Sequence, residues 1–429
     1  MSRSDHPIGR SLISDPALKV LNRLSSAGHR ACIVGGGVRD LLLGVTPKDF
    51  DVATDASPEE VRALFSNARL IGRRFRLAHV RFGREIIEVS TFRANLGADQ
   101  DSGKEDEGDD GDRRFHASGR ILRDNVFGSI EEDALRRDFT VNALYYDIAD
   151  RAIYDYVGGM ADVQARRLRL IGDAERRYRE DPVRCLRAVR IATKLGLDIE
   201  ADTAAPIRAL APLLADVPPA RLFDEALKLL MAPEAPAVFA PLRDYRLFDA
   251  LFPDAGAALD AAADVGGLTL IGQALSNTAE RIRQHRPVTP AFLFAALLWP
   301  AVRRSTQARV DQGLQAYPAQ MAAQREVIER QVQRVAIPRR FSVPMREIWQ
   351  LQPRFHRQRG KAPARLMAHP RFRAAYDFLL LRAQAGEESA DLARWWTEIQ
   401  EEHQAPVEPR RRRGRRAGRN RSRAGRSSS

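Results

Sequence analysis

The chain has 429 residues, of which 44% are hydrophobic, and this composition excludes a wholly disordered protein and a small disulfide-stapled scaffold. Its formal net charge is +13, but residues 410–429 alone contain ten arginines and no acid. Taking these ten from the 69 Lys and Arg leaves 59 against 56 Asp and Glu, so the rest of the chain is close to neutral. We therefore interpret the positive charge as an appended basic tail.

Cysteine content and hydropathy favour a cytoplasmic protein. Cys32 and Cys185 lie far apart, and no CxxC or HxxxH spacing indicates a zinc site. The first ten residues are polar and lack the apolar core of a signal peptide. The longest apolar stretch, 291–302, is shorter than the ~20 residues of a membrane span. It predicts a buried core helix, and we expect no membrane span.

Short strands and helices alternate over the first part of the chain. The predicted strands are 31–34, 50–54, 77–82 and 85–92. The predicted helices are 38–43 and a segment that starts at 57, with Pro58 at its first position. Gly83-Arg84 joins the last two strands as a hairpin. An apolar stretch follows at 139–148, and 154–170 is compatible with one more short hairpin.

Composition also divides the chain into domains. Residues 99–112 hold eight acids and one lysine, which predicts a solvated, mobile loop; a tolerated surface insertion is favoured over a role in repelling or mimicking RNA. After Asp181, apolar residues recur at helical spacing and strand-like segments largely disappear. The predicted domains are an α/β head with a small mixed sheet at 1–172, a helical neck at 173–235, a helical body at 236–405 and a disordered Arg-rich tail at 406–429.

The strongest local pattern is a glycine turn followed by two aspartates. Gly35 and Gly36 follow a predicted strand, where glycine lets the backbone approach a ligand closely and a helix N-terminus beyond can hold phosphate. Asp49 and Asp51 are two residues apart, so on a strand both carboxylates point to one face. Two negative charges at such a short distance are costly unless a cation lies between them. A site whose ligands are all oxygen atoms suits Mg²⁺. Two such ions would serve nucleotidyl transfer. An aspartate pair on a solvated edge strand is an equally weighted alternative.

Further charged residues stand beside apolar segments. Glu88 is a carboxylate in an otherwise apolar strand, and it is a candidate third ligand or an exposed edge-strand residue. Arg136, Arg137 and Asp138 precede an apolar segment, an arrangement that can bind a triphosphate and brace a metal site. A surface ion-pair cluster would look the same.

One more cluster opens a predicted helix. Asp181 is a predicted N-cap, with Pro182 at the first helical position. Arg184 and Arg187 lie one turn apart on one face of that helix. Such an edge could read a nucleobase through Arg donors and an Asp acceptor, or it could be a capped helix with solvated arginines. Spacing alone leaves both open.

Together these motifs resemble those of the class II tRNA nucleotidyltransferases and bacterial poly(A) polymerases, in the polymerase-β-like nucleotidyltransferase superfamily. The matching motifs are Gly35-Gly36-x-Val38-Arg39-Asp40, Asp49-x-Asp51, Arg136-Arg137-Asp138-Phe139-Thr140-x-Asn142 and Glu180-Asp181-x-x-Arg184-x-x-Arg187. The resemblance covers about 6–396. The acidic segment 99–112 is the clearest departure, and it lies between the motifs.

The resemblance implies a role for each matching residue. The implied catalytic acids are Asp49, Asp51 and Asp138, and the implied ligands of two Mg²⁺ ions are Asp49, Asp51 and Glu88. The implied nucleotide-binding residues are Gly35, Gly36, Arg39, Arg137 and Asn142 near the triphosphate, and Asp181, Arg184 and Arg187 at the base. In the implied reaction, the 3′ hydroxyl of RNA attacks the α-phosphorus of ATP in line and pyrophosphate leaves.

Several segments resemble the poly(A) polymerase branch in particular. They are 70–80, Ile337-Pro338-Arg339-Arg340, 369–377 and the Arg-rich end. This branch adds adenylates to the 3′ ends of mRNA and other transcripts and marks them for decay, so RNA-decay machinery is an expected partner and a monomer is the default. The neck and body are then expected to bind RNA.

Two basic segments are candidates for that RNA contact. Residues 354–361 interleave cations with Phe355, which suits an RNA backbone with an occasional stacked base; a basic solvated loop is the alternative. The Arg-rich tail is expected to bind RNA through counterion release.

Other functions compete with this interpretation. A CCA-adding tRNA nucleotidyltransferase has the same head, and Asp181 and Arg184 occur in both branches, so ATP selection is inferred from branch membership. A non-catalytic RNA-binding protein is disfavoured by the intact Asp49, Asp51 and Asp138. A nucleotidyltransferase acting on a small molecule would leave the helical region and the basic tail unexplained.

Overall fold

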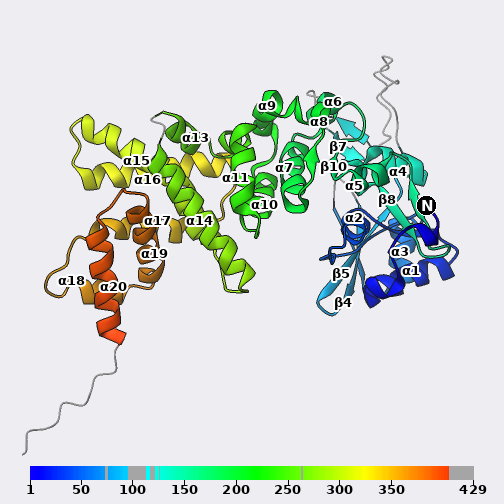
Figure 1. Cartoon of the computed structure of the whole chain (residues 1–429), viewed down its shortest axis with the longest axis horizontal. Helices are drawn as coiled ribbons and strands as arrows, with labels where there is room; N and C mark the ends of the chain where they lie inside the picture. The colour runs from blue at the N-terminus through cyan, green and yellow to red at the C-terminus, as the bar shows by residue number, and fades with distance from the viewer. Residues whose placement is uncertain (73–75, 95–112, 116–120, 125, 262–263, 405–429) are drawn as a thin grey trace, which may run out of the picture.

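The computed structural model describes residues 1–72, 76–94, 113–115, 121–124, 126–261 and 264–404, with backbone alone at 113–115, 121–124, 403 and 404. The predicted acidic loop at 99–112 and the basic tail at 406–429 lie outside these residues. An α/β unit is followed by helices that extend to the other end of the molecule (Figure 1). This confirms the predicted fold class. Within the described part of the chain, no helix is long and apolar enough to cross a membrane.

The α/β unit is built on a seven-stranded mixed sheet in the order β3-β4-β5-β2-β1-β8-β9. Its strands are β1 (Ala31–Val34), β2 (Asp51–Thr54), β3 (Ala68–Ile71), β4 (Leu77–Phe82), β5 (Glu85–Thr91), β8 (Leu144–Asp147) and β9 (Ile153–Asp155). β2 and β5 run parallel, and the other neighbours are antiparallel. The strands predicted at 31–34, 50–54, 77–82 and 85–92 are confirmed to within one residue, as is the turn at Gly83-Arg84.

Short helices complete the α/β unit. They are α1 (Asp15–Ser26), α2 (Gly36–Leu42), α3 (Pro58–Leu64), α4 (Ile130–Arg136) and α5 (Gly159–Gln164). α3 starts as predicted, with Pro58 at its first position and Ser57 as its N-cap, whose hydroxyl accepts the N–H of Glu60. Two small ladders lie outside the main sheet: β6 (Arg113–Phe115) with β7 (Ile121–Asp124), and β10 (Arg167–Leu168) with β11 (Asp198–Ile199).

The hairpin predicted for 154–170 is wrong. β9 pairs with β8, and β10 pairs in parallel with β11 from the helical part. Gly158 adopts a left-handed conformation (φ 79°), and helix α5 begins directly after it. The Asp155 carboxylate accepts the N–H groups of Gly159 and Met160, each at 2.9 Å. These local bonds turn the chain into a helix where a hairpin would need a second strand.

Helices are the predominant elements of the described chain after residue 173. They are α6 (Ala174–Glu180), α7 (Val183–Leu195), α8 (Ala201–Ala204), α9 (Ile207–Leu210), α10 (Pro219–Leu230), α11 (Ala235–Asp244), α12 (Leu247–Leu251), α13 (Pro253–Asp260), α14 (Val265–Arg283), α15 (Pro290–Asp311), α16 (Ala316–Arg334), α17 (Arg339–Leu351), α18 (Ala362–Met367), α19 (Phe372–Gln384) and α20 (Ala390–Gln404). The apolar stretch 291–302 lies inside α15 and is almost entirely buried, as predicted.

One apolar core runs through the head and the helices. A single cluster of buried side chains includes Val52 on β2, Leu186 on α7, Leu229 on α10 and Trp349 on α17. The head is therefore packed on the helical part and is more than a tethered unit. Cys32 and Cys185 are both buried and free, so no disulfide joins the two parts. The predicted domain limits at 172, 235 and 405 stay a prediction.

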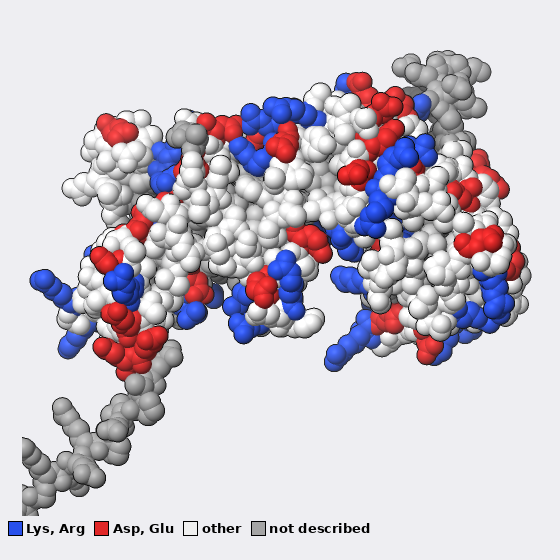
Figure 2. All heavy atoms as spheres, viewed as in Figure 1, with Lys and Arg blue, Asp and Glu red and all other residues white. Residues whose placement is uncertain are grey.

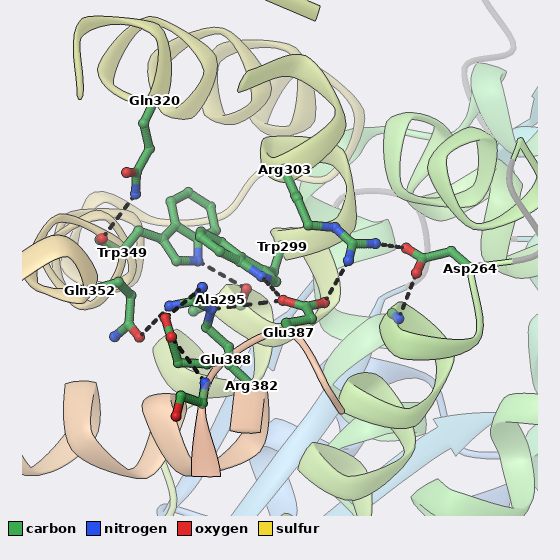
Figure 3. Close-up of polar contacts among 12 residues, drawn as sticks. Asp264, Ala295, Trp299, Arg303, Gln320, Trp349, Gln352, Arg382, Glu387 and Glu388 are labelled. Atoms are coloured by element: carbon green, nitrogen blue, oxygen red, sulfur yellow. Dashed lines mark hydrogen bonds and ion pairs between the residues drawn. The ribbon is translucent and has the colours of Figure 1, made fainter. Parts of the chain in front are cut away.

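A polar network fastens the helices of the body to one another (Figure 3). Glu387, in the α19–α20 connection, accepts the Trp299 Nε1–H at 2.7 Å and pairs with Arg303 Nη1 at 3.1 Å. Arg303 also pairs with Asp264 at the start of α14. Trp349 Nε1 donates to the Ala295 carbonyl at 3.0 Å. Because these groups are largely buried and paired, they hold the helices in one arrangement.

Candidate active site

The glycine turn lies directly against a carboxylate and a guanidinium. Gly35 follows β1 with φ 75°, a conformation that side chains rarely adopt, and α2 begins at Gly36. A Cβ built on Gly35 would lie 3.8 Å from Oδ2 of Asp51 and 3.8 Å from Nη1 of Arg137. The turn therefore brings open backbone beside one acidic and one basic group, as a phosphate-binding turn requires.

Two strands bring the predicted carboxylates together. Asp51 is the first residue of β2, where it is the register partner of Val34 on β1 and of Glu88 on β5. Asp49 is exposed and precedes the strand, so the expectation that both aspartates lie on one strand is met by Asp51 alone. Burial, together with the negative charges of Glu88 and Asp49, raises the pKa of Asp51 to about 6. This shift indicates a crowded group of acids.

These acids suit a magnesium ion in their chemistry, although they do not form a closed cage. Among the residues that the structure describes, no group of three His, Cys, Asp or Glu is placed to hold a metal ion. Glu88 is half exposed, and its Oε1 lies 3.3 Å from Nε2 of His79. Mg²⁺ is usually bound by one or two carboxylates with substrate phosphates as further ligands. Asp51 and Asp49 beside the glycine turn fit that pattern, with Glu88 next to them.

Asp138 has a different environment from these acids. Its Oδ2 accepts both Nε (2.8 Å) and Nη2 of Arg187, and its Oδ1 accepts Asn142 Nδ2 at 3.0 Å and the N–H of Phe139 at 2.8 Å. Although burial acts in the opposite direction, the Arg187 charge and these hydrogen bonds hold the pKa of Asp138 well below its usual range. Both oxygens are thus occupied by protein donors. The role of Asp138 as a catalytic acid stays a prediction.

Arg39 and Asn142 extend this cluster into the head. Arg39 is buried on α2, where its Nε donates to Asp40 at 2.9 Å and its Nη1 donates to Oδ1 of Asn142. Asn142 in turn donates to Asp138, which is paired with Arg187 on α7. Four residues predicted from three motifs therefore form one continuous chain of polar contacts between head and neck. A triphosphate contact for Arg39 or Asn142 stays a prediction.

Arg137 also lies beside the turn and is held there by two side chains. Its Nε donates to the Tyr145 hydroxyl at 2.8 Å, and its Nη2 pairs with Asp133 at 3.0 Å. The Asp133 charge and the Tyr145 hydrogen bond, working against burial, raise the pKa of Arg137. The sequence motif identified Arg137 but not Asp133 and Tyr145, which hold it in place. Asp133 lies one helical turn before Arg137, and this spacing was the available signal.

The residues predicted at the base side all have protein partners. Asp181 accepts Nη1 and Nη2 of Arg221 on α10 at 2.8 and 2.7 Å. Arg184 Nη1 donates to the Arg177 carbonyl at 2.7 Å and to Glu180 at 3.2 Å. α7 begins at Val183 with Pro182 as its N-cap, one residue later than predicted, because Asp181 is the C-cap of α6.

Sequence reasoning missed Arg221. It lies 40 residues from Asp181, and no local pattern connects the two.

Comparisons with known proteins identify the family. Three family models match the chain: the poly A polymerase head domain at 31–169, the probable RNA and SrmB-binding site of polymerase A at 196–259, and the polymerase A arginine-rich C-terminus at 312–428. Poly(A) polymerase I of Salmonella typhi is 52% identical over 402 residues, which are 93% of this chain and 85% of that protein. The chain belongs to the poly(A) polymerase I family.

Other members and neighbours of the poly(A) polymerase I family match over different lengths. Poly(A) polymerase I of Haemophilus influenzae is 47% identical over 90% of this chain and 84% of that protein. A CCA-adding enzyme of Geobacillus thermodenitrificans is 39% identical, but over 51% of this chain and 50% of its own length. The sequence match to this CCA-adding enzyme therefore covers only half of the chain.

Solved structures support the fold. The CCA-adding enzyme of Bacillus stearothermophilus in complex with CTP has a TM-score of 0.57 at 26% identity, covering 91% of this chain and 82% of that one. The CCA-adding enzyme of Thermotoga maritima complexed with tRNA has a TM-score of 0.58 at 16% identity, covering 93% and 83%. The second likeness shows a shared fold.

Proposed function

We propose that the protein is a template-independent poly(A) polymerase that transfers AMP from ATP to the 3′ end of RNA and releases pyrophosphate. Family membership supports the reaction class. The observation that carries it in this chain is the group of acids around Asp51, next to Asp49 and Glu88 and against the open backbone of Gly35. Acids in that position match the need of a nucleotidyl transfer for cation ligands beside a phosphate site.

Asp49 and Asp51 are proposed to hold Mg²⁺, with Glu88 beside them and two ions in the complete site. Bound Mg²⁺ lowers the pKa of an attacking hydroxyl and neutralises the charge on the leaving phosphates. The repulsion that raises the pKa of Asp51 is relieved when a cation lies between these carboxylates. No side chain has to form a covalent intermediate, and the two buried thiols, whose pKa is raised by burial, are unsuited to that role.

The triphosphate is proposed to lie along the glycine turn. The absence of side chains at Gly35 and Gly36 lets phosphate oxygens approach the backbone N–H groups. Arg137 presents Nη1 on the same side, while Asp133 and Tyr145 keep the guanidinium in place. Arg39 and Asn142 brace this side through their mutual hydrogen bond. A preorganised cation next to the phosphates stabilises the charge that develops on pyrophosphate.

The base is proposed to be read by Asp181 and Arg184, with Arg187 in support. Arg184 and Arg187 lie one turn apart on α7, and Arg187 is fixed to the head through Asp138. Arg221 donates two hydrogen bonds to the Asp181 carboxylate, and this bidentate pair orients it. An oriented acceptor and a nearby Arg donor can discriminate bases by their hydrogen-bonding edges.

The remaining expectations concern the setting of the reaction. RNA contacts are proposed in the neck and body, with the 3′ ends of mRNA and other transcripts as substrates and decay of the tailed RNA as the consequence. We further propose that the protein acts as a monomer in the cytoplasm, with RNA-decay machinery as a partner. The family model at 196–259, described as a probable RNA and SrmB-binding site, supports an RNA contact in the neck.

The test is extension of a labelled unstructured RNA with Mg²⁺ and a single NTP per reaction, beside a tRNA that lacks its 3′ end. We expect a long ladder with ATP alone, and none from an Asp49→Asn variant that still binds the RNA. Extension only of the tRNA, stopping after C, C and A, would assign the CCA-adding function. Folded protein that extends neither RNA with any NTP would contradict the proposal and favour a non-catalytic RNA-binding protein.

A further inference from the structure

A basic hollow of about 670 Å³ lies between the start of α16 and the segment that connects α17 with α18. Five cations and one aromatic side chain line it: Arg354, Arg357, Arg359, Lys361, Arg365 and Tyr317. In Figure 1, α18 is at the end of the molecule opposite the sheet, and in Figure 2 Lys and Arg atoms project there. We refer to these six residues as the basic hollow. It is separate from the active site in the head.

The charge of the basic hollow is unbalanced within the protein. No acid lines it, and the sequence contains no Asp or Glu between Glu347 and Asp377. Within the part of the chain that the structure describes, none of its five cations forms an ion pair, whereas the nearby Arg371 is paired with Glu347 at 2.9 Å. Clustered like charges repel one another, so an anionic ligand would stabilise this arrangement.

The segment that carries the cations is fastened to the body. Phe355 is fully buried, its ring packs edge-on against Trp396 at 5.0 Å, and its carbonyl accepts the Trp396 Nε1–H at 2.8 Å. Leu366 on α18 is buried in the same apolar cluster. Gln352, just before the segment, donates to the Ala375 carbonyl at 3.0 Å. The cations thus extend from a fixed scaffold, which lowers the entropy lost when a ligand is bound.

Tyr317 gives the basic hollow a second recognition element. It lies in the first turn of α16 with 56% of its surface exposed, so its ring is accessible to a ligand in the hollow. Proteins that bind single-stranded nucleic acid combine cations along the phosphate backbone with aromatic rings on which bases stack. A site for inorganic phosphate alone would need only the cations.

We propose that the basic hollow binds a single-stranded stretch of the RNA substrate upstream of its 3′ end, with its cations on the phosphates and Tyr317 stacked on a base. The inference rests on the proposed function for the identity of the RNA. The ligand is an upstream segment because the 3′ end has to reach the acids in the head, at the other end of the molecule. An RNA too short to span the two places uses the active site alone.

The test measures binding of labelled oligo(A) of increasing length to the full-length protein. Two variants probe the hollow, Arg357→Gln/Arg359→Gln and Tyr317→Ala, with Tyr317→Phe as the conservative variant. The double variant should weaken binding of long oligo(A) and lower its salt slope by about 1.4, since each phosphate contact on a single strand contributes about 0.7. Tyr317→Ala should weaken it roughly tenfold, and Tyr317→Phe should not. Short oligo(A) should be bound and extended as by the wild type.

A matched control removes the same charge elsewhere. Arg283 and Arg325 are exposed, each is paired with an acid on its own helix, and Arg283→Gln/Arg325→Gln should leave binding unchanged. Equal weakening by the control, or no change in the hollow variants, would overturn the inference. If inorganic polyphosphate displaces oligo(A) and Tyr317→Ala has no effect, the hollow is a general polyanion site and the RNA assignment is wrong. If no RNA is extended even by the wild type, the proposed function fails, while the binding result still decides the hollow.

Discussion

Replacing Asp51 with asparagine should abolish nucleotide addition and, at the same time, stabilise the metal-free protein near neutral pH. The two effects have one origin, since Asp51 is partly buried beside Glu88 and Asp49 and is costly to ionise without a cation. Asparagine has nearly the same shape and carries no charge, so it relieves the repulsion. It also removes a carboxylate oxygen that we propose as a ligand of Mg²⁺.

The size of the stabilisation follows from the pKa of Asp51, which the folded protein raises from 3.8 to about 6. At about 1.4 kcal/mol per pH unit, the shift corresponds to at most about 3 kcal/mol, and about 2 kcal/mol is expected after allowing for partial solvent exposure. This effect on the free energy of unfolding is opposite in sign to that of a carboxylate in an ion pair, because ionised Asp51 destabilises the folded protein. The penalty is absent below pH 3.8, grows as the pH rises to about 6 and is complete above it. The gain from asparagine should therefore appear at about pH 8 and vanish near pH 4.

Thermal unfolding in EDTA and in Mg²⁺ measures both effects. A gain of about 2 kcal/mol should raise the Tm of the Asp51→Asn variant in EDTA by about 2 °C, because one core joins the head to the helices and about 400 residues unfold together. Mg²⁺ should raise the Tm of the wild type and leave the variant unchanged. Asp391→Asn is the control, since Asp391 is 86% exposed and should change neither Tm nor activity. A variant less stable than the wild type in EDTA, or equal stabilisation of both by Mg²⁺, would refute a like-charge metal site at Asp51.

Three further predictions concern the neck and the tail. Arg187→Met should cost about 3 kcal/mol in denaturant unfolding, because it leaves the buried Asp138 without its bidentate partner, and adding Asp138→Asn should recover most of the loss; equal losses in both variants would contradict this. Arg221→Ala should raise the KM for ATP and weaken the preference for ATP over CTP, since Asp181 loses its orienting partner; unchanged single-nucleotide kinetics would exclude that role. Deleting 406–429 should weaken RNA binding and flatten its salt dependence, and an unchanged salt slope would exclude the tail as an RNA-binding element.

Local patterns predicted the elements around the site well. The strand at 31–34 is a short apolar run before a glycine turn, and α3 begins at the Ser57-Pro58 cap. These signals depend only on neighbours in sequence, so they can be recognised without knowledge of the fold. The prediction for 154–170 was wrong because it, too, depended only on neighbours in sequence. Its second strand, β10, takes its partner from residues 198–199, and no local pattern encodes a distant partner.

In the candidate site, too, local motifs were recognised and distant partners were not. The motifs identified Asp51, Asp138 and Arg187, but the chemistry of each residue depends on contacts that the motifs do not contain. Asp138 was predicted to be a catalytic acid because it is an acid in a family motif, but the motif did not show that its carboxylate pairs with Arg187. Arg221 could not be found from the sequence, because a solvated arginine and a bidentate partner of Asp181 have the same local pattern.

Selecting a base without a template places a geometric demand on such a protein. With no partner strand, the base has to be defined by side chains, for which we propose Arg184, and these must keep a fixed position relative to the acids proposed to bind the metal. The structure meets this demand through α7: Arg184 and Arg187 lie one turn apart, and Arg187 is locked to Asp138, which is connected through Asn142 to Arg39 beside the glycine turn. The same helix therefore carries the proposed base-reading face and the anchor to the head. A loosened anchor would move α7 relative to the glycine turn, so we expect the Asp138–Arg187 pair to contribute to nucleotide selection as well as to stability.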